Sequence, residues 1–225
     1  MVRRSFHGTR TGPVVASLVA VLFCPAMAAA QSGFEVSAYG GAQGALDSNV
    51  EISDDRVVPD LDVDVEWEGR SFDHPIYYGI RATYWTEGRW GFGLDLTHSK
   101  TYADPIPAPL TRLEFTDGLN VLTANAYYRF DRTDFGMTPY LGGGLGISIP
   151  YAEVDFPGSQ TRGYQVGGLA GKLMGGVKQE LGADWHLFGE VMITQSFNTV
   201  DLETGGELSS DVTTGALNFG LGYTF

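Results

Sequence analysis

The sequence predicts an all-β fold: an eight-stranded antiparallel transmembrane β-barrel of the outer membrane, preceded by a cleaved signal peptide. Three observations support this prediction. The first 30 residues have the pattern of an export signal, eight later segments alternate with a period of two, and the chain ends in an alternating aromatic segment. A period of two places apolar side chains on one face of each strand, as membrane barrels require.

Residues 1–30 contain the parts of a secretory signal peptide. Three arginines precede the apolar run PVVASLVAVLF, and AMAAA then offers small residues for cleavage after Ala30. The run is too short to span a bilayer. Cys24 suggests a lipoprotein, but its neighbours Phe23 and Pro25 do not fit a lipobox.

Removal of this segment leaves the predicted barrel domain, residues 31–225, with 11 basic and 27 acidic residues and no cysteine. The acidic balance argues against nucleic acid as a partner. The absence of cysteine argues against a small exported domain stapled by disulfides.

The alternating segments follow one another without a helical period. In chain order they are 34–39, 78–85, 90–97, 117–130, 140–149, 164–181, 186–198 and 211–225. In the second segment, for example, Tyr78, Ile80 and Ala82 alternate with Gly79 and Arg81. Closure into a barrel is required because lipid offers no partner to an unpaired strand edge.

The connections alternate in length, as they do in outer-membrane barrels. Short turns are predicted at 86–89, 131–137 and 182–185, and long polar external loops near 45–76, 99–116, 155–163 and 199–210. The acidic part of the first loop, 45–66, is interpreted as solvated; whether it forms a lid or stays disordered is left open.

The last segment is the most specific feature. One face of it carries Leu217, Phe219, Leu221, Tyr223 and Phe225. This pattern resembles the C-terminal strand signal that the barrel-assembly machinery reads in bacterial outer-membrane proteins. The alternative is a periplasmic β-sandwich that ends in an aromatic residue by chance.

Charged residues fall on the face of the strands opposite the apolar one. The expected structural lumen charges are Arg81, Asp95, Arg129, Lys172 and Glu190. Acids and bases should pair there, because an unpaired buried charge is costly. Such a network argues against a narrow channel and against a catalytic lumen.

A second polar set gathers at the outer rim if the N-terminus is periplasmic. Its members are Arg70, Asp73, His74, His98, Lys100, Arg112, Glu114, Asp117 and Asn120. Taken singly, the acids can bridge cations between lipopolysaccharide phosphates, and the bases can be ordinary phosphate contacts. A serine hydrolase is disfavoured, because His98 and Ser99 are adjacent and point to opposite faces of a strand.

Three stretches of the chain resemble the lipid A oxidase family of rhizobia and related α-proteobacteria: WEGRSFDHPIYYGIRATYW, FGLDLTHSKTYA and RLEFTDGLNVLTANAYYR. The resemblance implies oxidation of the proximal glucosamine of 1-dephosphorylated lipid A to 2-aminogluconate, with consumption of O2 and release of H2O2. The cofactor is unknown, and a divalent metal ion is one option.

Under this hypothesis the rim residues take three roles. The catalytic candidates are Glu114, Asp117 and His98, because oxidation of a hemiacetal needs a base for its hydroxyl proton. Candidate substrate-binding residues are Arg70, Lys100, Arg112 and Asn120. Candidate metal ligands are His74, His98, Asp73 and Glu114.

The rival hypothesis is a non-enzymatic barrel that stabilises the outer membrane or binds ligands at the cell surface. Under either hypothesis the expected partners are lipid A in the outer leaflet and, through Phe225, the assembly machinery. We expect a monomer.

Overall fold

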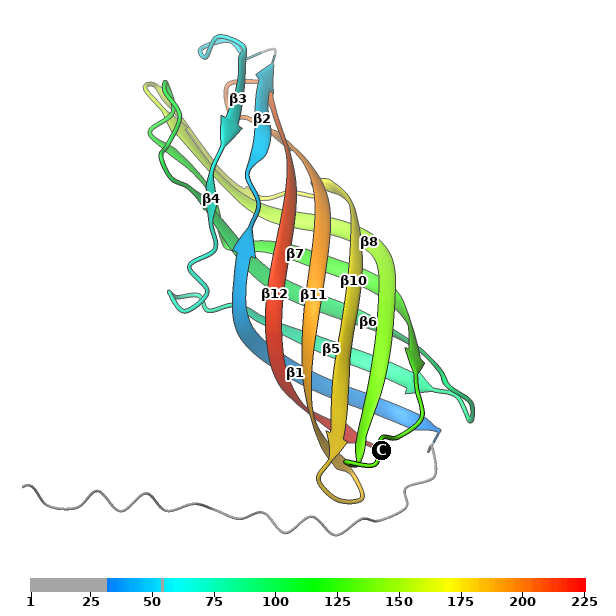
Figure 1. Ribbon diagram of the computed structural model, residues 1–225. Coiled ribbons are helices and arrows are strands. Elements are labelled where there is room, and N and C mark those ends of the chain that lie inside the picture. Colours follow the sequence, from blue (N-terminus) through cyan, green and yellow to red (C-terminus); the bar gives the residue numbers. More distant parts are fainter. Residues whose placement is uncertain (1–31, 54) are drawn as a thin grey trace, which may run out of the picture.

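The computed structural model describes residues 32–53 and 55–225, so the predicted signal peptide lies outside the described residues. Eight long antiparallel strands form a closed barrel in the order β1-β5-β6-β7-β8-β10-β11-β12, with β12 paired to β1 (Figure 1). This confirms the predicted fold. The barrel strands are β1 (Gly33–Ala45), β5 (Tyr78–Trp85), β6 (Trp90–Ala103), β7 (Arg112–Arg129), β8 (Met137–Phe156), β10 (Gly168–Glu180), β11 (Trp185–Asp201) and β12 (Glu207–Thr224).

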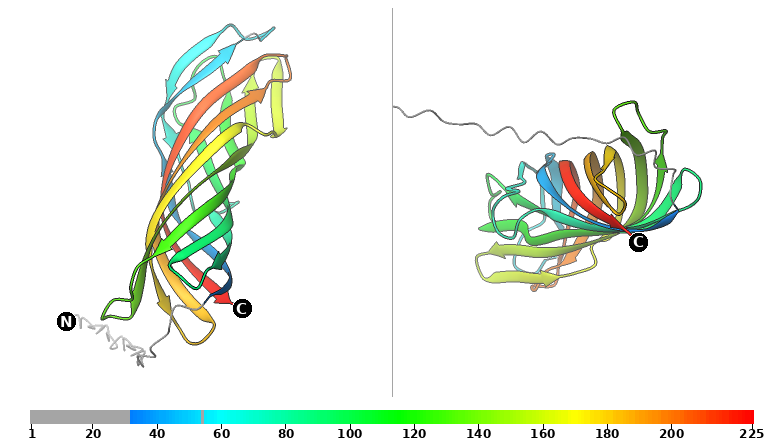
Figure 2. Two further views of the ribbon diagram at one scale, coloured as in Figure 1. Left: turned by 90° about the vertical axis from the view of Figure 1, so that its right-hand side faces the viewer. Right: turned by 90° about the horizontal axis from the view of Figure 1, so that it is seen from below.

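The two ends of the barrel differ. The C-terminus and the short turns lie at one end, called here the short-turn end, and the wall is prolonged at the other, the extended end (Figures 1 and 2). At the short-turn end the backbone N–H of Phe225 donates to the carbonyl of Phe34 at 2.8 Å. Short turns are typical of the periplasmic side of such barrels, so we infer that the extended end is the external one.

Four further strands build the extended end: β2 (Ser48–Ser53), β3 (Leu61–Val65), β4 (Trp67–Glu68) and β9 (Ser159–Tyr164). β2 pairs with β12 and with β3, β4 pairs with β6, and β9 pairs with β8. Within the described residues no helix is long and apolar enough to cross a membrane.

The structure therefore differs from the expected long loops. The acidic stretch 45–66 contains the β2–β3 hairpin, because Val50, Ile52 and Val65 alternate with its acids and are buried. Continuous pairing of β6 with β7 leaves a connection of only 104–111 in place of 99–116. Likewise, the predicted loop 155–163 is mostly β9, and 199–210 shrinks to 202–206.

The inward face of the barrel wall is polar between the short-turn end and its middle. Asp95 accepts from the Arg81 guanidinium at 2.8 Å and from the Lys172 ammonium. Arg81 also pairs with Glu190 at 2.8 Å, and Tyr140 donates to Glu190 at 2.7 Å. All of these side chains are buried. The ion pairs share this part of the lumen with a buried cluster rich in aromatic side chains, which includes Tyr39, Tyr127 and Phe188.

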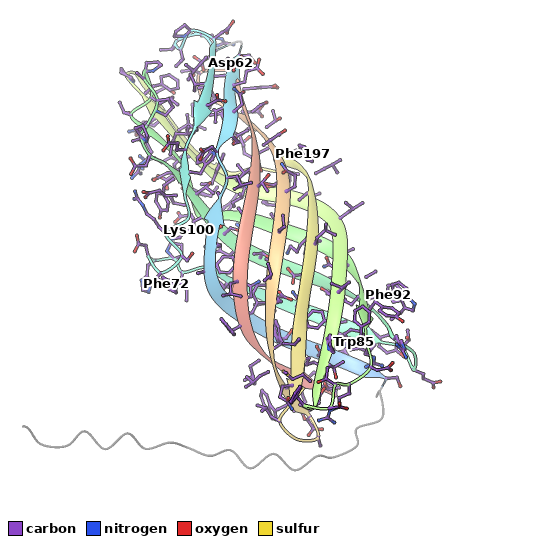
Figure 3. All side chains as sticks on the ribbon, in the orientation of Figure 1. Asp62, Phe72, Trp85, Phe92, Lys100 and Phe197 are labelled. Carbon is purple, nitrogen blue, oxygen red and sulfur yellow. The ribbon has the colours of Figure 1, made fainter. Side chains whose placement is uncertain are left out.

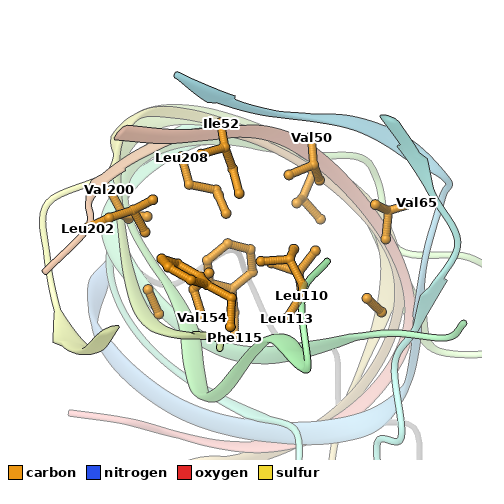
Figure 4. Close-up of a cluster of buried hydrophobic side chains, with 14 of the residues drawn as sticks. Val50, Ile52, Val65, Leu110, Leu113, Phe115, Val154, Val200, Leu202 and Leu208 are labelled. Atoms are coloured by element: carbon orange, nitrogen blue, oxygen red, sulfur yellow. The ribbon is translucent and has the colours of Figure 1, made fainter. Parts of the chain in front are cut away.

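The inside of the extended end is apolar instead. Figure 4 shows its side chains converging within the ring of strands. Phe115 and Val154 of the barrel wall pack there with side chains of the β2–β3 hairpin. The buried cluster also includes Val50, Ile52, Val65, Trp67, Leu110, Leu113, Leu119, Phe156, Val200, Leu202, Leu208 and Val212.

The outward face of the barrel is an apolar band. Phe92 and Phe197 point away from the barrel (Figure 3). Exposed members of this band include Val36, Ile80, Leu94, Leu96, Leu122, Leu145, Ile147, Leu173, Val191, Leu217 and Phe219. An apolar outward face and a polar lumen are the arrangement that a membrane-spanning barrel needs.

Candidate functional site

Three outward-facing rows interrupt the apolar pattern directly beyond the band. They run across β6, β7, β8 and β9 and begin at the first residue of β5; we call this surface the outer wall. The lower row is Tyr78, His98, Asn120 and Ile149. The middle row is Lys100, the bulge residues 116–118, Tyr151 and Tyr164. The upper row is Tyr102, Glu114, Glu153 and Arg162.

A β-bulge in β7 shapes the centre of the outer wall. Ser99 pairs with Leu119 and Thr101 with Phe115, so β7 has two more residues than β6 over this stretch. Gly118 adopts a positive φ of 123°, and a Cβ atom there would come within 2.5 Å of His98 Nδ1. Glycine is therefore required both by the backbone conformation and by the close approach of the imidazole.

His98 is held from two sides. Its Nδ1 lies 2.9 Å from Asn120 Oδ1, and its ring stacks on Tyr78 with centroids 5.0 Å apart. The amide nitrogen of Asn120 is directed to the Ile149 carbonyl at 3.4 Å, which orients the amide oxygen towards the imidazole. In this network Nδ1 carries the proton, and the buried Nε2 has no partner among the described residues. Nε2 thus has a free lone pair beneath the surface of the outer wall.

Lys100 is fully buried although it belongs to an outward row. Its ammonium donates to the Asp73 carbonyl at 2.6 Å and lies 3.4 Å from the Tyr102 hydroxyl. Burial lowers the pKa of this ammonium, while the Asp73 charge opposes the decrease and the Arg70 charge adds to it.

Residues 69–77, called here the strap, cover Lys100. β1 and β6 separate above the last β1–β5 pair, Gly40 with Tyr78, and the strap fills the gap. Gln43 Nε2 donates to the carbonyls of Gly69 and Lys100 at 3.1 and 2.8 Å, and the Ser71 hydroxyl donates to the Gln43 carbonyl at 2.9 Å.

Two neighbouring carboxylates dominate the upper row. Glu114 and Glu153 are directly opposite in the β7–β8 ladder, and Arg112 bridges them at 2.9 and 2.5 Å. Thr116 donates to Glu153 at 2.9 Å. Burial raises the pKa of Glu114, and the Glu153 charge adds to this increase while the Arg112 guanidinium opposes it.

The predicted site residues are only partly brought together. His98, Lys100, Glu114 and Asn120 share the outer wall, and Arg112 bridges its upper row. Arg70 lies on the strap with its guanidinium 4.5 Å from the ring centre of Tyr102 and ion pairs with Glu68 and Asp104. The exposed Asp117 contributes its backbone carbonyl, which accepts from Tyr164 at 2.7 Å.

The candidate metal ligands do not form a metal site. Asp73 and His74 are exposed on the strap, His98 is bound to Asn120, and Glu114 is bound to Arg112. Residues 32–53 and 55–225 contain no group of three or more His, Cys, Asp or Glu side chains that could hold a metal ion. The donor set therefore does not fit a bound metal.

The expected lumen charges point inward, but they divide into two groups. Arg81, Asp95, Lys172 and Glu190 form the network described above. Arg129 lies nearer the short-turn end, where it donates to the carbonyls of Thr86 and Gly88 at 3.0 and 2.7 Å.

A small cavity lies at the same end, remote from the outer wall. Trp85, Tyr127, Lys178 and His186 are among its lining residues. Glu35 lies 3.2 Å from His186 Nε2 and 2.9 Å from Lys178 Nζ, so its carboxylate has partners within the protein.

Several outer-wall residues were not among the candidates from the sequence: Thr116, Tyr151, Glu153, Arg162 and Tyr164. They join the site through the β7–β8 and β8–β9 registers, which are long-range pairings. The available signal was the alternation of Tyr151 and Glu153 with the apolar Ala152 and Val154.

Comparisons with known proteins agree with the architecture. The family model described as "Outer membrane protein beta-barrel domain" matches residues 16–225. OprG from Pseudomonas aeruginosa is similar in structure, with a TM-score of 0.52, 17% identity, and coverage of 86% of this chain and 96% of that chain. Neisserial surface protein A has a TM-score of 0.48 and 20% identity, covering 86% of this chain and 98% of its own. At 17% identity the likeness to OprG shows the fold alone. No curated protein matches the sequence.

Proposed function

The chain belongs to the outer membrane β-barrel family and is located in the outer membrane; from this premise, we propose that it is a lipid A oxidase. The proposed reaction converts the proximal glucosamine of 1-dephosphorylated lipid A to 2-aminogluconate, with O2 as the oxidant and H2O2 as the second product. Lipid A in the outer leaflet is the proposed partner, and β12 together with the terminal Phe225 is the proposed segment for barrel assembly.

The position of the outer wall is the observation that carries this proposal. His98, Lys100 and Glu114 belong to outward rows directly beyond the apolar residues Leu96 and Leu122. The rows reach the surface at Glu114 and Asn120, while His98 is buried and the strap covers Lys100. A lipid can reach such a surface by moving sideways in its leaflet, without leaving the membrane. The lumen offers no comparable route, because buried ion pairs fill it.

The outer wall supplies a base and positive charge for the reaction. His98 Nε2 accepts the proton of the anomeric hydroxyl, while the C1–H bond breaks and its electron pair and hydrogen pass to O2. The sugar becomes a lactone and O2 becomes hydroperoxide, which takes up a proton to give H2O2. Water then opens the lactone to the aminogluconate. Arg70, exposed on the strap, holds the remaining lipid phosphate, and the buried Lys100 ammonium adds positive charge beneath the strap.

The direct test is mass spectrometry of 1-dephosphorylated lipid A after incubation with the folded protein in detergent, with peroxide measured in parallel. We expect one added oxygen on the proximal sugar in air and none under argon. An arm with EDTA decides whether a metal participates. Unchanged lipid from a correctly folded, heat-modifiable barrel would refute the proposal.

Variants locate the chemistry. His98→Gln should lower turnover about 100-fold or more, because it removes the proposed base. His74→Gln is the matched control, since this histidine is exposed on the strap, and it should retain wild-type turnover. Equal turnover of both variants would exclude His98 as the base.

The second candidate function is a non-enzymatic barrel that stabilises the outer membrane. Its supporting observation is the lack of an assembled metal-ligand group among the described residues, combined with a lumen closed by ion pairs. The same mass-spectrometric experiment separates the two candidates.

A further inference from the structure

Tyr151 and Tyr164 form an aromatic pair in the middle row of the outer wall. They are opposite each other in the β8–β9 ladder, with ring centroids 4.8 Å apart in an edge-to-face arrangement. The Tyr164 ring is 58% exposed. The contact with Tyr151 therefore fixes the orientation of the Tyr164 ring, and Tyr164 remains exposed at the surface.

The surroundings of this pair differ from those of an aromatic membrane belt. At the short-turn end Tyr128 packs between Trp90 and Phe130, with centroids 5.1 and 5.2 Å away, as belt residues do. Tyr164 instead donates its hydroxyl to the Asp117 carbonyl at 2.7 Å. Because the hydroxyl is hydrogen-bonded within the protein, the part of Tyr164 that remains open to a ligand is its ring.

Polar neighbours flank the tyrosine pair. Glu153 and Arg162 stand one row above it, directly opposite each other in the β8–β9 ladder. Arg162 pairs with Asp155 at 2.8 Å. Carboxylate and guanidinium groups beside an exposed ring are suited to the hydroxyl groups and apolar face of a sugar, and they are costly next to acyl chains.

The pair also lies at the depth of the lipid head groups. Tyr151 is four residues beyond Ile147, an exposed member of the apolar band on the same strand. At roughly 3.3 Å per residue this is about 13 Å along the strand. The strand tilt of such barrels reduces this to about 10 Å along the membrane normal.

We propose that Tyr164, positioned by Tyr151 and by Asp117, is a stacking platform for a hexopyranose ring of the lipid A head group. The axial C–H bonds of a pyranose form an apolar, weakly positive face, which stacks on the electron-rich face of an aromatic ring. The exposed Arg162 donates to the sugar hydroxyls at the edge of the pyranose. The inference rests on the proposed function for the identity of the lipid, but it concerns binding and is tested without turnover.

The experiment measures the affinity of the full mature chain, folded in detergent, for fluorescent lipid A. Unlabelled lipid A, the free unacylated glucosamine disaccharide and phosphatidylglycerol serve as competitors. Tyr164→Leu removes the ring but stays apolar, Tyr164→Phe keeps the ring and loses the hydroxyl bond, and Tyr84→Leu removes an exposed tyrosine of the lipid-facing belt as the control. Heat modifiability verifies that each variant is folded.

The expected result is a loss of affinity of about ten-fold in Tyr164→Leu, about three-fold in Tyr164→Phe, and less than about two-fold in Tyr84→Leu. The free disaccharide should compete with lipid A on the wild type, whereas phosphatidylglycerol should not. Wild-type affinity in Tyr164→Leu, or equal competition by phosphatidylglycerol, would overturn the platform.

The experiments can refute the oxidase proposal and the Tyr164 platform independently of each other. Weakened binding in Tyr164→Leu together with an inactive wild type would support the platform and refute the oxidase. Active wild type with unchanged binding in Tyr164→Leu would do the reverse.

Discussion

The same strands enclose two interiors of opposite character. In the membrane-spanning half, Asp95, Lys172 and Glu190 form buried ion pairs, whereas the inside of the extended end holds Phe115 and Leu208 among other apolar side chains. The outward face changes in the opposite sense, from Leu122 to Glu114 within β7. Within the membrane the barrel thus has an apolar outside and ion pairs inside. Beyond the membrane it has the arrangement of a soluble protein, with polar side chains outside and an apolar core.

This inversion marks the outer boundary of the membrane more closely than loop lengths do. The outward side chains change from apolar to polar between Leu96 and His98 on β6 and between Leu122 and Asn120 on β7. These strands are neighbours, so the two changes lie at one level. The outer wall is the surface immediately beyond that level, where lipid A head groups lie.

The largest predicted effect comes from breaking the charged interior. Asp95→Ala leaves the buried Arg81 and Lys172 cations without this partner, and we expect a loss of about 3–5 kcal/mol in unfolding free energy. Urea titration in detergent measures it. Asp211→Ala, an exposed acid on β12, should cost less than about 0.5 kcal/mol; equal losses would contradict a structural ion-pair network.

A smaller effect tests the outward face. Leu145→Arg places a cation in the middle of the apolar band and should destabilise the folded, membrane-inserted barrel by about 2–4 kcal/mol. Gln160→Arg on β9, at an exposed position of the extended end, should change stability by less than about 0.5 kcal/mol. Urea titration of both variants in lipid vesicles measures the two changes in unfolding free energy. An unchanged unfolding free energy in Leu145→Arg would mean that this position does not face the membrane interior.

The apolar interior should unfold on its own. Leu208→Ala creates a cavity in the extended end, with an expected cost of about 2 kcal/mol. Hydrogen exchange should increase in β2, β3 and the outer part of β12, while the charged half stays protected. Ser209→Ala, on the opposite face of the same strand, is the control. Increased exchange throughout the barrel would mean that the two interiors unfold as one unit.

The smallest effect concerns the pH dependence of the outer wall. Because the folded-state pKa of Glu114 is raised, the folded chain holds a proton that the unfolded chain has lost, from the ordinary carboxyl range up to the raised value. This contribution to stability is full at low pH and disappears as the pH rises through that window. Glu114→Gln should make stability decrease less steeply as the pH rises. The measurement is the urea midpoint of unfolding between mildly acidic and neutral pH, and the same dependence of midpoint on pH in wild type and variant would contradict the prediction.

The barrel could be predicted from the sequence because apolar residues alternate with polar or small residues within each strand, so each strand shows locally which of its faces is apolar. The β2–β3 hairpin was missed although Leu61, Val63 and Val65 alternate with Asp62 and Asp64. The density of acids favoured a solvated loop, and only the pairing with β12 shows why the alternate residues are buried.

The candidate site was harder to predict than the barrel because several of its residues come together only through long-range strand pairing. Strand polarity placed His98 and Asn120 at one end of neighbouring strands, and the structure brings them within 2.9 Å. Glu153 and Tyr164 reach the outer wall through the bulge in β7 and the register of β8 with β9, neither of which a local pattern specifies. The candidate metal set failed because Asp73 and His74 belong to the strap.

Photo-crosslinking tests the central claim most directly, namely that lipid A occupies the outer wall. A benzophenone amino acid is placed at Asp117, which is exposed on the bulge, and in a second protein at Glu51, which is exposed on the β2–β3 hairpin. Outer membranes are irradiated, and mild acid then removes the polysaccharide so that only lipid A adducts remain. The outer-wall account predicts a lipid A adduct at position 117 and none at position 51. Adducts at both positions, or none at 117, would contradict it.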